Sequence, residues 1–558
     1  MDGMIVKALD ESFPGRSGEA QRKFLLYKEK HPEKLLLLHF NGNARDPAFD
    51  QHFFTPTSWT YYVGAEANGA ISADTKTVNV KDISPYKVGM KGVNTFNDPV
   101  ALVPKSSQGE LLWKQAEYAT VEAIDEATNT LRLSRGKFGT TAKEYGNGQL
   151  YIAPIVTDIP PNKDIKRPLW RYNYSYFSDT TNTAKQLHDN LIHYLREEGS
   201  LNTFDGISFD VIAHTRPVRH WSRDRKIDYN LDGKFSNADI ESQANYSKGV
   251  YTLFSLLRAS LPNKLIMSDG SELNQQRGFG LLNGIENEAW PSLWDKEIDL
   301  WYTGINRLNF WNSRSIEPSF NYIKIGKMPM RGKGHYNPAE NYRRLRVASA
   351  LLTGTTIAPS YKANYAKVDR WPELIGSKRA YNRWLGTPKS EFNYLFLKQD
   401  QEQPIIPQVK KLTERSIEVL FNVKDRADIH MTYRFKLNNL PTHSPAGLVT
   451  LRIDQSKEPF DSTWADEGNF TSHFQLYNLE PGVHRIHITS DNGNLSLDDY
   501  SIIHAIAIPY REFDNGLVIA NPTSNKISID QHNLPKNMSY LGKIEINKKD
   551  ALIRSFSE

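Results

Sequence analysis

Residues 35–40, Leu-Leu-Leu-Leu-His-Phe, form a continuous apolar run of strand length. A strand with apolar residues at successive positions is buried on both faces, which is typical of a parallel sheet covered by helices. Similar runs follow at 207–212, 265–269, 281–288, 322–325 and 356–359. Segments with helical spacing lie between the runs, at 183–198, 241–260 and 339–352. This alternation predicts an α/β chain and favours a (β/α)8 TIM barrel over an open sheet.

Other parts of the chain have a different pattern. Residues 66–155 contain short alternating segments separated by Gly, Pro, Asn and Asp, which predicts a small inserted β domain. Residues 408–508 alternate in the same way and predict a β-sandwich, with either a carbohydrate-binding or an architectural role. Residues 509–558 predict short strands that complete a small terminal sheet. The barrel is therefore assigned to residues 1–65 and 156–400.

The composition excludes several classes of protein. The chain has 558 residues, of which 39% are hydrophobic and 24% charged, as is typical of a globular protein with a sizeable core. The net charge of +5, without a long basic run, is too weak to indicate nucleic-acid binding. The absence of cysteine excludes disulfides and thiolate metal sites. No apolar run approaches the ~18 residues that a transmembrane helix needs.

Asp210 is the first candidate for chemistry. Because side chains alternate along a strand, Ser208 and Asp210 point to one side, and Ile207 and Phe209 point to the other. The C-terminal ends of barrel strands form the active-site face, so we expect Asp210 to be catalytic. The alternative is that Asp210 caps a loop or pairs with an arginine.

A second carboxylate is expected at the end of the run 281–288. Glycoside hydrolysis needs two carboxyl groups, one to protonate the leaving oxygen and one to attack the anomeric carbon or activate water. Glu286 and Glu288 share one side of this predicted strand. Glu288 lies nearer the strand end and is the predicted partner of Asp210, whereas Glu286 is predicted to position substrate or to pair with an arginine. Metal-dependent and isomerase barrels also carry acidic strand ends, so the pair alone does not determine the reaction.

The segment 228–239, Asp-Tyr-Asn-Leu-Asp-Gly-Lys-Phe-Ser-Asn-Ala-Asp, has the spacing of a calcium-binding loop. Oxygen ligands at loop positions 1, 3, 5 and 12, a glycine at 6 and a backbone carbonyl at 7 match the EF-hand pattern, with Asp in place of the usual final Glu. The predicted Ca²⁺ ligands are Asp228, Asn230, Asp232, the Lys234 carbonyl and Asp239. We expect the ion to stabilise the loop. The alternative is a polar turn whose Asp and Asn side chains bond their own backbone.

Aromatic residues are numerous, with 27 Tyr, 25 Phe and 11 Trp, and several of them follow the predicted strands. Flat rings stack on sugar faces, and they equally fill apolar cores, so both interpretations stay open. Polar residues at or after the strand ends are further candidates for contact with substrate. The predicted substrate-binding residues are Asn41, Asp269, Glu272, Glu286, Trp290, Tyr302, Trp311 and Tyr361.

Four segments together carry a resemblance to a known family: Phe204–Asp210, Asp228–Gly233, Asn283–Glu288 and Arg511–Val518. The chain resembles bacterial TIM-barrel glycoside hydrolases of the hypothetical glycosyl hydrolase family 15 type, and more distantly polygalactosaminidase-type barrels. The resemblance implies a catalytic pair formed by an Asp after the fourth strand and a Glu after the sixth, which corresponds to Asp210 and Glu288. The chain departs from that pattern by offering Glu286 as well, which leaves the acid/base assignment open.

The sequence therefore predicts a glycoside hydrolase that acts on a polysaccharide or oligosaccharide. The resemblance implies a retaining mechanism with Asp210 as nucleophile and Glu288 as acid/base. A non-catalytic polysaccharide-binding or surface protein that keeps a barrel as its scaffold is the alternative. Residues Met1–Met4 lack the pattern of a secretion signal. Since such signals are removed on export, we expect a secreted, periplasmic or cell-surface protein, with a cytoplasmic location as the alternative.

Overall fold

A computed structural model shows the fold of the chain. It describes residues 3–9, 17–47, 55–91, 95–158, 168–175, 183–212, 214, 225–235, 240–269, 276–287, 290, 301–325, 340–359, 371, 385–398, 405–534, 538 and 541–556. The chain divides into two compact units, Met1–Ser268 and Asp269–Glu558.

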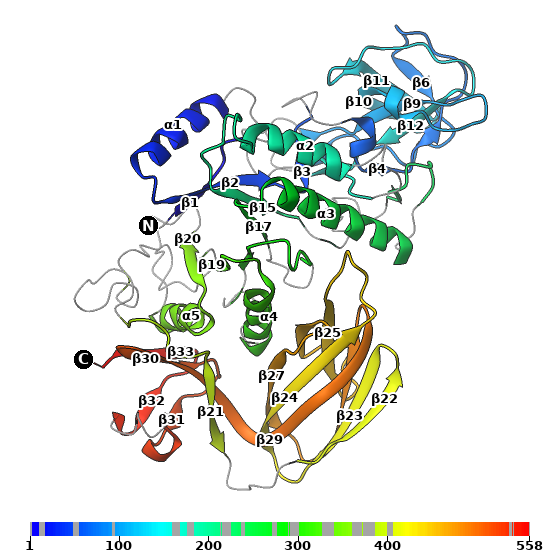
Figure 1. Ribbon diagram of the computed structural model, residues 1–558. Coiled ribbons are helices and arrows are strands. Elements are labelled where there is room, and N and C mark those ends of the chain that lie inside the picture. The colour runs from blue at the N-terminus through cyan, green and yellow to red at the C-terminus, as the bar shows by residue number, and fades with distance from the viewer. Residues whose placement is uncertain are drawn as a thin grey trace. The chain divides into compact units, whose positions relative to one another are not determined.

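Parallel strands and helices alternate in the first unit (Figure 1). In sheet order the strands are β1 (Gly3–Val6), β2 (Leu35–Asn41), β15 (Gly206–Asp210) and β17 (Leu265–Asp269). The helices are α1 (Ser17–Lys30), α2 (Thr183–Leu195) and α3 (Ile240–Ser260), and α2 and α3 lie side by side. The apolar run at 35–40 forms β2, as predicted, and its Phe40 ring meets Phe209 of β15 edge to face at 5.9 Å.

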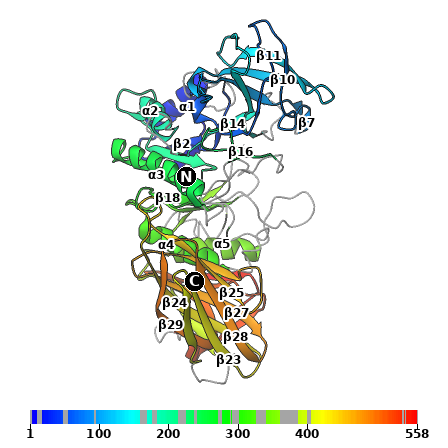
Figure 2. The same cartoon turned by 90° about the vertical axis from the view of Figure 1, so that its right-hand side faces the viewer.

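The second unit begins with three more parallel strands in the order β18 (Gly284–Asn287), β19 (Tyr322–Ile325) and β20 (Thr356–Pro359). Its helices are α4 (Trp301–Arg314) and α5 (Glu340–Thr353) (Figure 2). Buried side chains of both helices share a core with Val518 and Ala551 of the C-terminal strands. This shared core anchors the helices on the antiparallel part of the unit.

The prediction of a (β/α)8 TIM barrel is wrong. Strands make up 44% of the structure and helices 18%, and the described residues contain five α-helices where a closed barrel needs eight. Among the described residues β1 pairs only with β2, and β20 only with β19, so the parallel rows stay open. The physical reason is that apolar runs alternating with amphipathic segments are common to open and closed parallel sheets.

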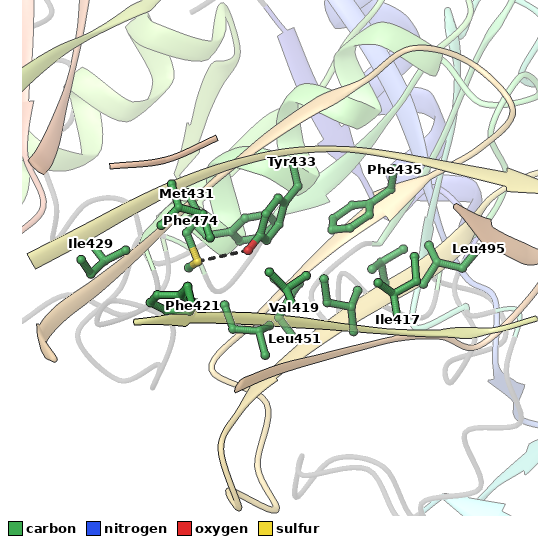
Figure 3. Close-up of a cluster of buried hydrophobic side chains, with 14 of the residues drawn as sticks. Ile417, Val419, Phe421, Ile429, Met431, Tyr433, Phe435, Leu451, Phe474 and Leu495 are labelled. Atoms are coloured by element: carbon green, nitrogen blue, oxygen red, sulfur yellow. Dashed lines mark hydrogen bonds between the residues drawn. The ribbon is translucent and has the colours of Figure 1, made fainter. Parts of the chain in front are cut away.

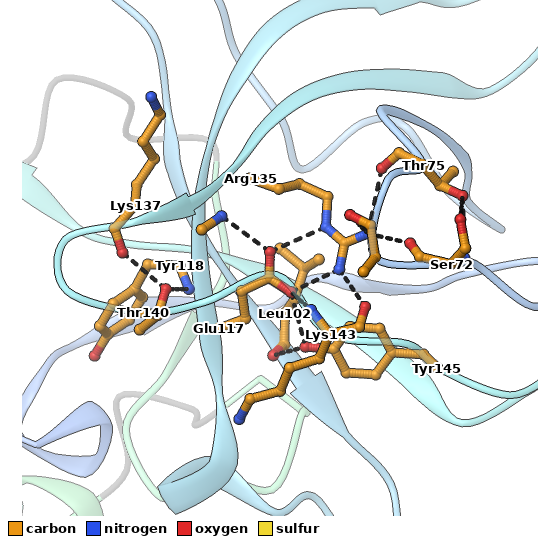
Figure 4. Close-up of polar contacts among 12 residues, drawn as sticks. Ser72, Thr75, Leu102, Glu117, Tyr118, Arg135, Lys137, Thr140, Lys143 and Tyr145 are labelled. Atoms are coloured by element: carbon orange, nitrogen blue, oxygen red, sulfur yellow. Dashed lines mark hydrogen bonds and ion pairs between the residues drawn. The ribbon is translucent and has the colours of Figure 1, made fainter.

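A six-stranded antiparallel sheet fills residues 65–154 of the first unit. Its order is β5 (Ala65–Glu66), β12 (Leu150–Pro154), β9 (Pro99–Pro104), β10 (Glu117–Asp125), β11 (Thr130–Lys137) and β6 (Thr77–Asn79). Glu117 is fully buried there and pairs with Arg135 through two bonds, Nε to Oε1 at 3.0 Å and Nη2 to Oε2 at 2.6 Å (Figure 4). The backbone amides of Gly136 and Lys143 also donate to this carboxylate, which satisfies the buried charge.

Short strand pairs and one three-stranded sheet complete the first unit. They are β3 (Ala44–Arg45) with β14 (Leu169–Arg171) and β13 (Thr157–Asp158), β4 (Tyr61–Tyr62) with β16 (Ile227–Asp228), and β7 (Met90–Lys91) with β8 (Thr95–Phe96).

Two antiparallel sheets face each other in the second unit. One has the order β22 (Gln408–Thr413), β23 (Ser416–Val423), β28 (Gly482–Ser490), β25 (Gly447–Ile453) and β26 (Asp461–Ala465). The other has the order β27 (Thr471–Leu479), β24 (Ala427–Asn438), β29 (Asn494–Phe513), β30 (Gly516–Asn521) and β33 (Asp550–Ser555). Side chains of both sheets form one core around Tyr433 and Phe474 (Figure 3).

Strand β29 also pairs with β21 (Asn393–Lys398), and β31 (Ile527–Ile529) pairs with β32 (Ile544–Ile546) beside the terminal strands. β29 runs without a break through residue 508, where the sequence placed the end of the sandwich. The predicted domain boundaries stay predictions. Within the described ranges, no helix is both long and apolar enough to cross a membrane.

Candidate functional site

Asp210 is the last residue of β15, and its strand register pairs it with Asn41, the last residue of β2. Ile207 and Phe209 are buried at 0% and 1% exposure, whereas the Asp210 side chain is 35% exposed. His39 of β2 places its Nε2 atom 3.3 Å from Asp210 Oδ2. Neighbouring parallel strands thus bring a carboxylate, an imidazole and an amide residue to one sheet end.

The backbone directly after Asp210 is strained. Val211 has a φ of +52°, in the left-handed region that β-branched residues rarely adopt, and its side chain is 45% exposed. The Gly42 amide donates to the Asp210 carbonyl at 2.7 Å, and a Cβ on Gly42 would lie 2.7 Å from Ile212 Cβ. The turn after β2 therefore lies tightly against the chain that leaves β15, which holds Asp210 in place.

Asn41 has a structural task in this turn. Its Oδ1 atom accepts hydrogen bonds from the backbone amides of Asn43 at 2.9 Å and of Ala44 at 3.1 Å. This arrangement is an Asx turn, in which a side-chain oxygen replaces a backbone acceptor. The Asn41 side chain orders the loop beside Asp210, and its role in substrate binding stays a prediction.

Glu286 lies in β18 of the second unit and is held by two residues of β19. The Lys324 Nζ atom is 2.6 Å from Glu286 Oε1, and the Tyr322 hydroxyl donates to Glu286 Oε2. The Glu286 side chain is only 14% exposed. A general acid needs a proton on one oxygen, and on Glu286 that proton would remove the negative charge that pairs with the Lys324 ammonium group.

Several predicted site residues fall outside the part of the chain that the structure describes. These are Glu288, Glu272, Tyr361 and Asp239. Asp269 belongs to the described residues and is the half-buried last residue of β17. It follows Ser268, which pairs with Phe209 of β15. The pairing of Asp210 with Glu288 therefore stays a prediction.

Three aromatic residues predicted to bind substrate lie in the core of the second unit. Trp290 and Trp311 are 0% exposed and Tyr302 is 3% exposed. Trp290 Nε1 donates to the Trp301 carbonyl at 3.1 Å, and the Trp311 ring lies 4.1 Å from that of Phe279. These rings lie in the core, which was the alternative that the sequence left open. Their role in sugar binding stays a prediction.

The described part of the predicted calcium loop is bonded to its own backbone. Asp228 is fully buried, and its two oxygens accept from the amides of Asp232 at 3.2 Å and Gly233 at 2.8 Å. Burial raises the pKa of Asp228 to about 7. Leu231 and Gly233 both have positive φ, at +63° and +79°, which curls the turn around Asp228.

The donor set fits a hard cation in part. Asn230, Asp232 and Lys234 are exposed, whereas the buried Asp228 carboxylate accepts from the backbone amides of Leu231, Asp232 and Gly233. Within the described residues, however, no three His, Asp or Glu side chains gather as a metal site. The final ligand of the predicted set, Asp239, belongs to the undescribed residues, so calcium stays a prediction.

Three residues that contact the carboxylates of Asp210 and Glu286 were not predicted from the sequence. They are His39, Tyr322 and Lys324. His39 and Lys324 are polar residues within otherwise apolar strand runs, and His39 has the same parity as Asn41. A polar residue at alternate positions of a buried strand was the signal that could have identified them.

Comparison with known proteins leaves the family open. No family model and no curated protein matches this chain, so the resemblance to the glycosyl hydrolase family 15 type stays a prediction. Among solved structures, the chain is similar to a Paenibacillus sp. cycloisomaltooligosaccharide glucanotransferase complexed with cycloisomaltoheptaose, at 12% identity and a TM-score of 0.23. That match covers 87% of this chain and 48% of the other, so the chain spans about half the length of the glucanotransferase.

Two further solved structures are similar to the chain. An isomalto-dextranase from Arthrobacter globiformis, complexed with panose, matches at 9% identity and a TM-score of 0.22, over 60% of this chain and 74% of its own. The C-terminal CBM6 module of a laminarinase from Zobellia galactanivorans matches at 9% identity and a TM-score of 0.13, over 20% of this chain and 99% of its own. Carbohydrate-active enzymes and carbohydrate-binding modules are thus among the matches.

Proposed function

We propose that this protein is a carbohydrate-active enzyme that hydrolyses glycosidic bonds in a polysaccharide or oligosaccharide. The position of Asp210 is the observation that supports this proposal. The residue ends a buried parallel strand, is 35% exposed and has the imidazole of His39 at 3.3 Å. A carboxylate that is partly open to solvent and has an imidazole beside it can reach a substrate directly.

The proposed mechanism uses two carboxyl groups and retains the configuration of the sugar. The Asp210 carboxylate attacks the anomeric carbon while the Glu288 carboxyl donates its proton to the leaving glycosidic oxygen. A covalent glycosyl-enzyme forms, and Glu288 then removes a proton from the water that hydrolyses it. His39 would orient the Asp210 oxygen that does not attack.

Glu286 is proposed to position substrate. Because Lys324 and Tyr322 occupy its two oxygens, this carboxylate offers a fixed acceptor to a sugar hydroxyl more readily than a proton to a leaving group. Glu288 is therefore the proposed acid/base residue.

The full-length chain tests the proposal through reducing ends released from a panel of purified polysaccharides. We expect Asp210→Asn and Glu288→Gln each to lower the rate by about 10²–10⁴-fold, because each removes a group that acts in the transition state. Asp74→Asn, which changes an exposed aspartate of the same unit, is the control and should keep the wild-type rate. Equal melting temperatures exclude misfolding as the cause.

Other outcomes lead to different assignments. An active Glu288→Gln enzyme would move the acid/base role to Glu286. Proton NMR of the first product tests the stereochemistry. A product of inverted configuration would mean an inverting enzyme, whose two carboxyl groups lie ~6.5–9.5 Å apart and not the ~5–5.5 Å of a retaining one. A wild-type chain that binds a polysaccharide in the panel and releases no reducing ends would be the non-catalytic binding protein.

We also propose that Ca²⁺ binds the loop 228–239. Removal of the ion with a chelator should lower the melting temperature, and added Ca²⁺ should restore it, since a ligand that binds only the folded state stabilises it. Asp228→Asn removes the first ligand and should abolish the response to chelation. A wild-type melting temperature that stays the same with and without chelator would leave the backbone-bonded polar turn as the explanation of this loop.

A further inference from the structure

The second unit contains a cavity of about 870 Å³. Helix α4, strands β21, β27 and β29, and the turn after α5 contribute its lining. The volume falls in the upper part of the range found for small-molecule sites, ~300–1,000 Å³. None of the described lining residues was a predicted site residue.

One wall of the cavity is a row of amide side chains on α4. Asn306, Asn309 and Asn312 are spaced three residues apart and therefore lie on one face of the helix. Asn306 is anchored by paired bonds with the His473 backbone at 2.7 and 3.0 Å, and Asn312 donates to the Thr353 carbonyl at 2.6 Å. Asn309 is half-buried between them, and its side chain has no hydrogen-bond partner among the described residues.

Aromatic side chains form another part of the lining. Phe392, Tyr394 and Phe396 occupy alternate positions at and in β21, so their rings share one face of the strand. The rings of Phe392 and Tyr394 are 5.4 Å apart, and Tyr394 lies 4.4 Å from the ring of His473. Phe396 is 37% exposed, which leaves part of a flat apolar ring open to a ligand.

The described lining residues carry no net charge that would attract an ionic ligand. Their charged side chains are Arg511 and Glu391, one of each sign. Arg511 donates from Nη1 to the carbonyls of Leu351 and Leu352, each at 3.0 Å, and so caps the C-terminal end of α5. Burial lowers the pKa of His473 to about 4, which keeps that ring neutral near pH 7.

We infer that this cavity binds a neutral oligosaccharide. A sugar ring presents apolar C–H faces and a rim of hydroxyl groups, each of which both donates and accepts. Asparagine amides also do both, and aromatic rings pack against the C–H faces. The unpartnered amide of Asn309 disfavours a plain hydrocarbon ligand, which would cover its polar atoms without offering a hydrogen bond, and the charge balance of the described lining disfavours a polyanion.

The inference goes beyond the proposed hydrolysis, because binding in this cavity requires no bond cleavage. The test uses the full-length Asp210→Asn chain, so that no sugar is consumed, and isothermal titration calorimetry. The probes are maltotriose, isomaltotriose, cellotriose and mannotriose, with trigalacturonate as the anionic control. We expect at least one neutral trisaccharide to bind and trigalacturonate not to bind.

Two second substitutions locate the site. Asn309→Ala removes an amide that has no structural partner, and Phe396→Ala removes an exposed ring, so each should weaken binding on the order of tenfold without loss of melting temperature. Tyr500→Ala is the matched control, since Tyr500 is 41% exposed on β29 and does not line the cavity. It should leave the dissociation constant unchanged.

Three results would overturn the inference: no binding of the four neutral probes, binding of trigalacturonate alone, or affinities unaffected by both Asn309→Ala and Phe396→Ala. The outcome is independent of the hydrolysis assay. If the wild-type chain cleaves nothing while a trisaccharide binds in an Asn309-dependent way, the proposed hydrolase fails and this inference stands. If cleavage occurs and no trisaccharide binds the Asp210→Asn chain, the proposed hydrolase stands and this inference fails.

Discussion

His430 is buried and His473 is half-buried in the second unit, and His430 Nε2 lies 3.2 Å from His473 Nδ1. Desolvation lowers the pKa of His430 to about 3, with a further contribution from His473, and lowers the pKa of His473 to about 4. An unfolded chain binds protons on histidine near pH 6.5. The pair is therefore neutral in the folded protein at pH values where the unfolded chain is protonated.

The sign of the pH dependence follows from this difference. Between pH 6.5 and about 4 the unfolded state binds more protons, so the free energy of unfolding should fall as the pH is lowered, by up to about 1.4 kcal/mol per pH unit for each histidine. Urea unfolding at pH 6.5, 5.5 and 4.5 measures the slope. His430→Gln should reduce it, whereas His487→Gln, at a more exposed histidine of the same sandwich, should not. Equal slopes for the wild type and His430→Gln would contradict the prediction.

At the scale of one element, β28 shows how buried and exposed side chains that alternate along a strand contribute to stability. Ile486 and Ile488 are 0% exposed and belong to the core between the two sheets, whereas Val483 of the same strand is 72% exposed. Successive side chains point to opposite faces of a strand, so one strand has a buried and an exposed row. The buried row holds the two sheets together through packing and removal of apolar surface from water.

Ile486→Ala should lower the free energy of unfolding of this part of the chain by about 2–5 kcal/mol, because it removes buried methyl groups and leaves a cavity. Val483→Ala on the same strand is the matched control, and its effect should stay within about 0.5 kcal/mol. Urea unfolding measures both. Similar losses for the two variants would mean that the strand is not divided into a core row and a solvent row.

At the scale of the whole molecule, the chain has separate cores in its two compact units. One core lies within the six-stranded sheet of the first unit, around Val121 and Leu133. Others lie in the second unit, between the sandwich sheets and beneath α4 and α5. Chains of several cooperative parts commonly do not unfold in one all-or-none step.

Differential scanning calorimetry tests this expectation. The calorimetric enthalpy should exceed the van't Hoff enthalpy, and Ile486→Ala should lower the midpoint of one transition while another keeps its temperature. The untouched transition serves as the internal control. Equal enthalpies with a single shifted peak would show that the chain unfolds as one cooperative system.

The sequence by itself determined the strands and much of the helical pattern. The run at 35–40 forms β2, the run before Asp210 forms β15, and the alternation at 482–490 forms β28, because each pattern depends on which side chains of one short segment are buried. The position of Asp210 at the end of its strand followed from the same local rule.

Only the tertiary structure decided whether the parallel strands close into a barrel, which rings are buried and what the carboxylates contact. Closure depends on pairing between strands far apart in the chain, and alternation is the same for open and closed sheets. Trp290 and Trp311 are buried because neighbouring elements cover them, and Glu286 meets Tyr322 and Lys324 across a gap of 36 and 38 residues. Such contacts depend on how elements pack, and no periodicity within one segment encodes that packing.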